Sequence, residues 1–260
     1  MIQAFKRSRT GSRLVMAAAI VISVVIWFRD RDYPVFIPII ASTLMLGIGY
    51  FSSRVVGNLL ANMENTRYLG YLHMELDPPK FLSCYRDVPG QLKPGSEGEA
   101  VYRSYLADGY AAAGDFDTAL ELNSRKIPTG NIPLRGLYAS NRCAYCLGKE
   151  DVTGAKEAIA ELEEIIDASR LKNAELAKNL SQNLAVYREH INCLTGSRVD
   201  TEALENAFRR AQYHIRRLEI KKVLAMTALR DSDAAAAKEH LTFLRKNGGK
   251  THFKRWADQQ

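Results

Sequence analysis

Two long apolar runs near the N-terminus constrain the fold of this chain more than any other feature. Residues 14–28 and 35–51 contain no charged side chain, and the short link between them, 29–34, carries two arginines and two aspartates. The uncharged stretch 33–53 has 21 residues. A helix of that length reaches about 31 Å, which matches the hydrocarbon core of a bilayer. We therefore expect residues 1–56 to form a basic tail and a transmembrane hairpin that is anchored in the membrane through residues 14–51.

A cleaved signal peptide and a buried hairpin of a soluble protein are the two alternatives. A basic segment before an apolar run also describes a signal peptide. However, the first run ends in Trp27-Phe28-Arg29 without small cleavage-site residues, and a second run follows at once. Neither run has the polar face of a helix in a soluble protein. The first run is short for a span, at about 22 Å, so we expect Arg13 and Arg29 to extend toward the headgroups.

The positive charge of the chain is concentrated around these runs. Residues 1–56 carry seven Lys or Arg against two Asp, whereas the rest carries 29 basic and 27 acidic residues, within a net charge of +7. The positive-inside rule places the N-terminus in the cytoplasm, and two spans return the chain to the same side. The sequence predicts a cell-membrane protein with both termini cytoplasmic. The nearly neutral remainder does not favour nucleic-acid binding.

Residues 57–260 are predicted to form a second, all-α domain. Alternation with period two is absent, and short breaks containing Gly, Pro or Asp separate helical segments of roughly 10–20 residues. Asp77-Pro78 is typical of a helix start. Gly114-Asp115 is expected to end one helix and cap the next, and Gly248-Gly249 to end another. Single helices are predicted over residues 171–195 and 201–218.

Residues 100–126, AVYRSYLADGYAAAGDFDTALELNSRK, combine small and aromatic residues at helical spacing on both sides of the Gly-Asp turn. Tyr110 and Ala119 lie nine residues apart. The segment resembles a tetratricopeptide repeat, a helix pair of about 34 residues with such residues at fixed places. Arg103 stands at the Trp position of that family and Ala107 at a Gly position. Weaker echoes follow in residues 141–166 and 222–244.

This resemblance covers roughly residues 62–250 and implies an α-solenoid whose concave groove binds a protein or peptide. If the repeat is placed correctly, the groove residues are expected to include Tyr102, Arg103, Tyr110 and Asn141.

A second candidate surface lies in residues 209–222, RRAQYHIRRLEIKK. On a single helix, residues spaced i, i+4, i+7 and i+11 share one face. Four basic side chains have this spacing: Arg210, His214, Arg217 and Lys221. We expect an outward basic face here, which is either a solvated surface or a contact for an acidic partner or anionic headgroups.

No group of residues indicates catalysis, a metal or a cofactor. Cys143 and Cys146 form a CxxC pair, but no second pair accompanies it and it falls inside a predicted helix, so we expect core packing. Gly249-Lys250-Thr251 resembles the end of a P-loop but lacks its first glycine and the preceding strand. The five histidines show no ligand spacing.

These features predict a membrane-anchored interaction scaffold or adaptor whose helical domain binds an unidentified protein or peptide. The alternative is an integral subunit or accessory of a membrane transport or export complex, in which the hairpin itself is the interface. An enzyme with an unrecognised site is a third possibility.

Overall fold

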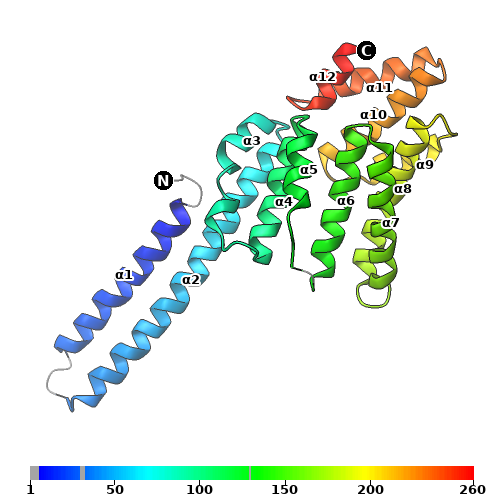
Figure 1. The fold of residues 1–260 in the computed structure, drawn as a ribbon. Coiled ribbons are helices and arrows are strands. Elements are labelled where there is room, and N and C mark those ends of the chain that lie inside the picture. The colour runs from blue at the N-terminus through cyan, green and yellow to red at the C-terminus, as the bar shows by residue number, and fades with distance from the viewer. Residues whose placement is uncertain (1–5, 30–32, 129) are drawn as a thin grey trace. The chain divides into compact units, whose positions relative to one another are not determined.

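The computed structural model describes residues 6–29, 33–128 and 130–260, and this part contains twelve α-helices, one short 3₁₀ helix and no strand. The all-α prediction is confirmed. The chain divides into two compact units, Met1–Tyr68 and Leu69–Gln260, whose helices are drawn in Figure 1. The domain boundary predicted after residue 56 falls inside helix α2 (Phe36–His73), because that helix continues past the apolar run without a break.

The first unit is a helical hairpin with small residues between its helices. Helices α1 (Lys6–Arg29) and α2 are both long and apolar enough to cross a membrane. A Cβ atom added to Gly49 would lie 2.2 Å from the Cβ of Ala19, so the two backbones approach closely there. Ser23 Oγ and Ser42 Oγ each donate to the carbonyl oxygen of the other serine, at 3.5 and 3.3 Å. Small and hydroxyl-bearing residues of this kind are typical of helix contacts in membranes.

The second unit consists of helices joined mostly by short turns. After the end of α2 come α3 (Pro78–Tyr85), which starts at the predicted Asp77 cap, and the 3₁₀ helix η1 (Pro89–Gln91). Four helix pairs and a terminal helix follow: α4 (Glu97–Ala112) with α5 (Phe116–Ser124), α6 (Ile132–Gly148) with α7 (Val152–Ser169), α8 (Ala174–Leu194) with α9 (Thr201–Arg210), α10 (His214–Arg230) with α11 (Ala234–Asn247), and then α12 (His252–Gln259).

Three of the four turns within these pairs have the same structure. Each has a left-handed residue followed by an aspartate, and the aspartate N–H donates to the carbonyl five residues earlier at 2.9 Å. The aspartate side chain then accepts from the N–H three residues later and caps the second helix. This combines a helix-ending Schellman turn with an N-cap. The left-handed residues are Gly114, Glu150 and Ser232, and the aspartates are Asp115, Asp151 and Asp233.

Small buried residues recur at fixed distances from the three aspartates. The residue eight positions before each aspartate is fully buried, and the residue four positions after it is at most 4% exposed. These small side chains let the two helices of a pair approach closely. The first set is Ala107, Cys143 and Ala225, and the second is Ala119, Ala155 and Ala237. The repeat is therefore visible in the structure at places where the sequence gives only a weak echo.

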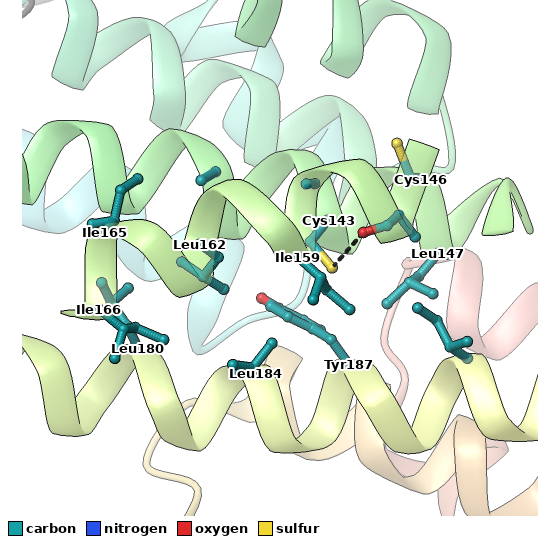
Figure 2. Close-up of a cluster of buried hydrophobic side chains, with 14 of the residues drawn as sticks. Cys143, Cys146, Leu147, Ile159, Leu162, Ile165, Ile166, Leu180, Leu184 and Tyr187 are labelled. Atoms are coloured by element: carbon teal, nitrogen blue, oxygen red, sulfur yellow. Dashed lines mark hydrogen bonds between the residues drawn. The ribbon is translucent and has the colours of Figure 1, made fainter. Parts of the chain in front are cut away.

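A buried apolar cluster joins α6, α7 and α8, as Figure 2 shows. Leu162 of α7 and Leu184 of α8 belong to it, and so do both cysteines of the CxxC pair. Burial raises the pKa of the Cys143 thiol, whose Sγ lies 3.9 Å from the Ala155 carbonyl oxygen. The CxxC pair thus forms part of the core, as expected from its place inside a helix.

The C-terminal end of the second unit returns to its beginning. Lys250 N–H donates to the Leu76 carbonyl at 2.8 Å, and Lys250 Nζ lies 2.6 Å from Asp77 Oδ2. On α12, Arg255 Nη2 donates to the Ala113 carbonyl at 2.5 Å. The helix array is therefore closed on itself, with α12 beside the α4–α5 turn in Figure 1, whereas a solenoid of stacked pairs would leave its two ends apart.

The predictions of single helices over residues 201–218 and 209–222 are wrong. Helix α9 ends at Arg210 and α10 begins at His214. Between them Ala211 has an extended backbone, with φ −66° and ψ 119°. The break places the basic residues of this segment on two separate helices.

Candidate functional site

A cavity of about 730 Å³ lies within the second unit. Much of its lining comes from α4, α6, α8 and α10, the first helix of each pair, and the rest includes residues of α12 and the 211–213 break. Its volume is in the range typical of ligand sites. The cavity is the concave side of the closed array, so side chains that are far apart in the sequence meet there.

A carboxyl group with a raised pKa lies on the α4–α6 side of the cavity. Asp108 Oδ1 accepts hydrogen bonds from the Tyr145 hydroxyl and from Asn141 Nδ2, the latter at 3.0 Å. Asn141 Nδ2 also lies 3.0 Å from Ser104 Oγ. Removal of the carboxylate from water raises the pKa of Asp108 to about 7, although the Tyr145 hydrogen bond opposes this shift. Asp108 therefore changes its charge near neutral pH.

An ion pair from α10 lines the middle of the cavity. Arg216 pairs with Glu219, and Arg216 Nη2 donates to the Asn183 carbonyl at 3.3 Å. The guanidinium carbon lies 5.0 Å from the centroid of the Tyr187 ring. The Tyr187 hydroxyl in turn lies 3.0 Å from Ser140 Oγ. Arg216 and Glu219 therefore neutralise each other within the fold.

Two further titratable side chains with perturbed pKa values come from α8 and α10. Lys222 is 4% exposed and His190 is 3% exposed, and both line the cavity. Burial lowers the pKa of Lys222. Burial also lowers the pKa of His190 to about 3, and the charges of Lys222 and Arg216 add to this effect. The Nε2 atom of His190 is buried without a hydrogen-bond partner. Perturbed groups gathered in a cleft are typical of functional sites.

The structure places the predicted groove residues in different surroundings. Asn141 lines the cavity, whereas Tyr102, Arg103 and Tyr110 do not. Tyr102 stacks on Tyr85 with a centroid distance of 5.9 Å. Tyr110 is partly buried against the apolar contact of α4 with α5.

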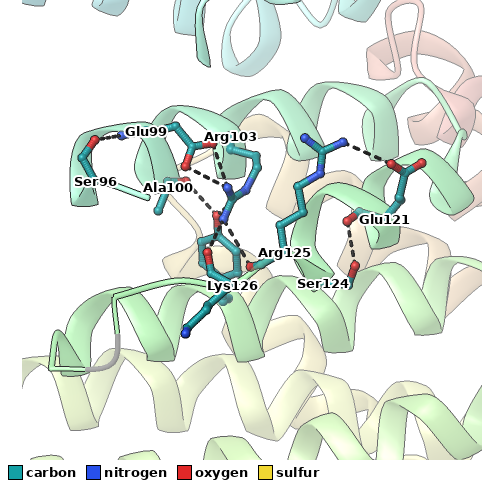
Figure 3. A network of polar contacts seen from close by, with 9 residues as sticks. Ser96, Glu99, Ala100, Arg103, Glu121, Ser124, Arg125 and Lys126 are labelled. Atoms are coloured by element: carbon teal, nitrogen blue, oxygen red, sulfur yellow. Dashed lines mark hydrogen bonds and ion pairs between the residues drawn. The ribbon is translucent and has the colours of Figure 1, made fainter. Parts of the chain in front are cut away.

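Arg103 is 4% exposed, and its guanidinium is used within the fold, as Figure 3 shows. It binds both carboxylate oxygens of Glu99 at 2.7 and 2.8 Å and donates to the Tyr138 hydroxyl at 3.2 Å. Its Nη2 donates to the carbonyls of Arg125 and Lys126 at 3.2 and 3.1 Å. Arg103 thus ties α4 to α6 and to the segment between α5 and α6. We therefore leave it out of the site.

The four predicted basic residues do not form one outward face. Arg210 ends α9 and lines the cavity, while His214 is exposed at the start of α10. The Arg217 guanidinium lies 4.5 Å from the Phe208 ring centroid. Lys221 is 6% exposed and pairs with Glu205 at 2.8 Å. The expectation that Lys221 points outward is therefore corrected, because the pairing of α10 with α9 and α11 buries that side chain.

Sequence reasoning missed the cavity residues Asp108, His190, Arg216 and Lys222 as site residues. His190 gave a weak signal, since it is a polar residue next to the apolar stripe of residues 184–194. Lys222 is the last residue of the basic segment 209–222 and does not share the spacing of the four predicted basic residues. The cavity joins residues of α4, α6, α8, α10 and α12, and such long-range packing could not be read from local spacing.

Among the described residues, no group of three or more His, Cys, Asp or Glu side chains is arranged to hold a metal ion. Comparison of the chain with protein-family models, with curated proteins and with solved structures found no match. The arrangement of the cavity itself is therefore the basis for a functional proposal.

Proposed function

We propose that this protein is a membrane-anchored adaptor whose cavity in the second unit binds a segment of a partner protein or peptide. The observation that carries the proposal is the cavity, because the first helices of all four pairs contribute to its lining. Polar groups with perturbed pKa values lie on its wall. The lining combines apolar side chains with many polar and charged ones, which can orient a bound segment.

The repeating turn supports a relation to tetratricopeptide-like helical repeats. Helices α4 and α6 begin 35 residues apart, at residues 97 and 132, close to the repeat length of that family. The next two intervals are longer, since α8 begins at residue 174, 42 residues after α6, and α10 at residue 214, 40 residues after α8. Proteins built from such repeats bind other proteins on their concave side.

The proposed location is the cell membrane, with two spans and both termini in the cytoplasm. The basic residues before the first apolar run support this orientation. The four free cysteines suit a reducing compartment. Anchoring would raise the effective concentration of the cavity near other membrane components.

Photo-crosslinking in native membranes tests the proposal. A photoreactive amino acid would replace Asn179, which lines the cavity, and in a matched variant Lys172, which lies in the turn before α8. We expect discrete partner adducts from position 179 and none of the same size from position 172. Equal adduct patterns at the two positions, or no adduct at position 179, would count against a binding cavity.

Exchange of the hairpin separates the adaptor from the alternative, an integral subunit or accessory of a transport or export complex. Residues 1–56 would be replaced by an unrelated two-span anchor. The adaptor proposal predicts that the adducts from position 179 persist. Loss of those adducts, with the protein still folded and in the membrane, would instead favour the subunit, because the hairpin would then be the required interface.

A further inference from the structure

We propose that the part of the cavity lined by Lys222 and His190 binds a carboxylate group, with the Lys222 ammonium as counterion and His190 Nε2 as hydrogen-bond donor. The inference rests on the proposed function, because the carboxylate would belong to the ligand held in the cavity. It adds a chemical class to that ligand.

Lys222 supplies a buried positive charge without a direct counterion. Within the part of the chain that the structure describes, its ammonium forms no hydrogen bond or ion pair, and the contact it makes is with the Trp256 ring, at 5.3 Å from Nζ to the ring centroid. Glu219 is engaged by Arg216, and Glu150, which attracts Lys222 over a longer range, is exposed. A buried unpaired charge is costly, so a bound anion would remove a cost that the free protein carries.

His190 supplies a second, independent observation. Its Nε2 atom is buried, has no hydrogen-bond partner, and belongs to a side chain that lines the same cavity. A neutral imidazole with the proton on Nε2 can donate one hydrogen bond. A carboxylate has two acceptor oxygens, so it can accept from His190 and from Lys222 at the same time.

The charge balance of the cavity favours one negative charge over two. The lining carries Arg210, Arg216 and Lys222 against Glu175, Glu219 and the titrating Asp108. With Asp108 protonated one positive charge is left over, so one carboxylate neutralises it, whereas a dianion such as sulfate would leave an excess of negative charge. The carboxylate could come from a peptide C-terminus, an acidic side chain or a free organic acid, which share this chemistry.

Binding should weaken as the pH rises. The titratable and charged side chains that line the cavity beside His190 and Lys222 come from several helices and include Asp108 on α4, Tyr145 on α6, Glu175 and Tyr187 on α8, Arg210 on α9, Arg216 and Glu219 on α10, and His252 on α12. An anion raises the pKa of His190 and of Lys222, so the complex holds protons more tightly than the free protein. Deprotonation of Asp108 near pH 7 adds negative charge and acts in the same direction.

Trp256 gives a direct readout. The chain has two tryptophans, Trp27 and Trp256, so W27F leaves one reporter beside Lys222. The full-length variant in detergent micelles would be titrated with sodium acetate, sodium chloride and sodium sulfate at constant ionic strength and pH 6.5. We expect a saturable fluorescence change with acetate, with a dissociation constant on the order of millimolar. Sulfate, which is a dianion at this pH, should bind at least about threefold more weakly, and chloride should not saturate.

Matched variants and peptides complete the test. K222M should abolish the acetate response, whereas K238M, which removes the same charge from an exposed position on α11, should keep it. H190Q, which retains a donor, should bind more tightly than H190L, and circular dichroism would check folding in each case. Three peptides identify the source of the carboxylate. A response to acetylated trialanine with a free C-terminus, but not to its amide, indicates a peptide C-terminus. A response to an amidated peptide with one glutamate indicates an acidic side chain.

The inference is overturned if folded K222M responds like its parent or if chloride matches acetate. Its failure is separable from that of the proposed function. Partner adducts at position 179 without an acetate response would retain the adaptor and reject the carboxylate site. An acetate response without partner adducts would retain the carboxylate site and reject the adaptor.

Discussion

The hairpin and the closed array are built from the same secondary structure with opposite placement of large apolar side chains. In the hairpin, Phe28, Leu44 and Phe51 are 62–69% exposed, while Ala19 and Ser23 lie inside. In the array, Leu147 and Phe81 are fully buried. Water drives large apolar groups inward, whereas lipid does not, and helices in lipid associate through small residues. The location of large side chains therefore indicates the solvent for which each unit is suited.

The largest expected difference is between two arginine substitutions, one in each unit. Arg103→Met removes a buried partner of Glu99, so we expect the array to lose about 3–5 kcal/mol of unfolding free energy. Arg54→Met, at an exposed arginine beside Tyr50 in the hairpin, should cost less than about 1 kcal/mol. Chemical denaturation of the full-length variants in micelles, followed by circular dichroism, measures both. Similar losses in the two variants would contradict the assignment of Arg103 to the framework of the array.

An intermediate effect is expected from two glycines of the hairpin. Gly49→Leu places a side chain against Ala19, whereas a Cβ on Gly47 meets nothing within 4 Å. We expect Gly49→Leu to destabilise the hairpin contact by about 1–3 kcal/mol and Gly47→Leu to leave it unchanged. The measurement is the yield of a disulfide between cysteines introduced at Ser23 and Ser42, with Gly47→Leu as the matched control. If both leucine variants retain the parental yield, the hairpin is not held by close backbone contact.

The smallest effect is a pH dependence of the array. The pKa of Asp108 is raised to about 7 in the folded protein, so between about pH 4 and 7 the folded state keeps a proton that the unfolded state has lost. Stability therefore falls as the pH rises through this window. Asp108→Asn removes the titration and should gain about 1–2 kcal/mol relative to the parent between pH 6 and pH 8. A difference independent of pH would show that Asp108 does not titrate in this range.

Local rules predicted much of the fold. The apolar runs gave two helices with the properties of membrane spans, and Asp77 and Asp115 start helices as their capping chemistry predicts. The turn at Glu150 was harder to predict, since a non-glycine residue with φ 62° occupies the left-handed position. The break at Ala211 contains no glycine or proline. It follows from the packing of α9 and α10 and not from local preference.

The candidate site was less accessible to sequence reasoning. Asn141 lines the cavity, whereas Arg103 forms hydrogen bonds and an ion pair within the fold and Lys221 is buried. Burial of a charged residue depends on which helices pack around it, and Lys221 is covered by the packing of α10 with α9 and α11. Spacing along one helix carries no information about such long-range contacts.

The contact between Lys250 and the Leu76–Asp77 segment also bears on the order of events during synthesis. A hydrogen bond that joins residues 173 positions apart cannot form until almost the whole chain has left the ribosome. Chains fold from the N-terminus as they emerge, so the hairpin is complete long before the array can close. We therefore expect nascent chains to reach the membrane with the cavity still open, and binding competence to begin only with the last helix.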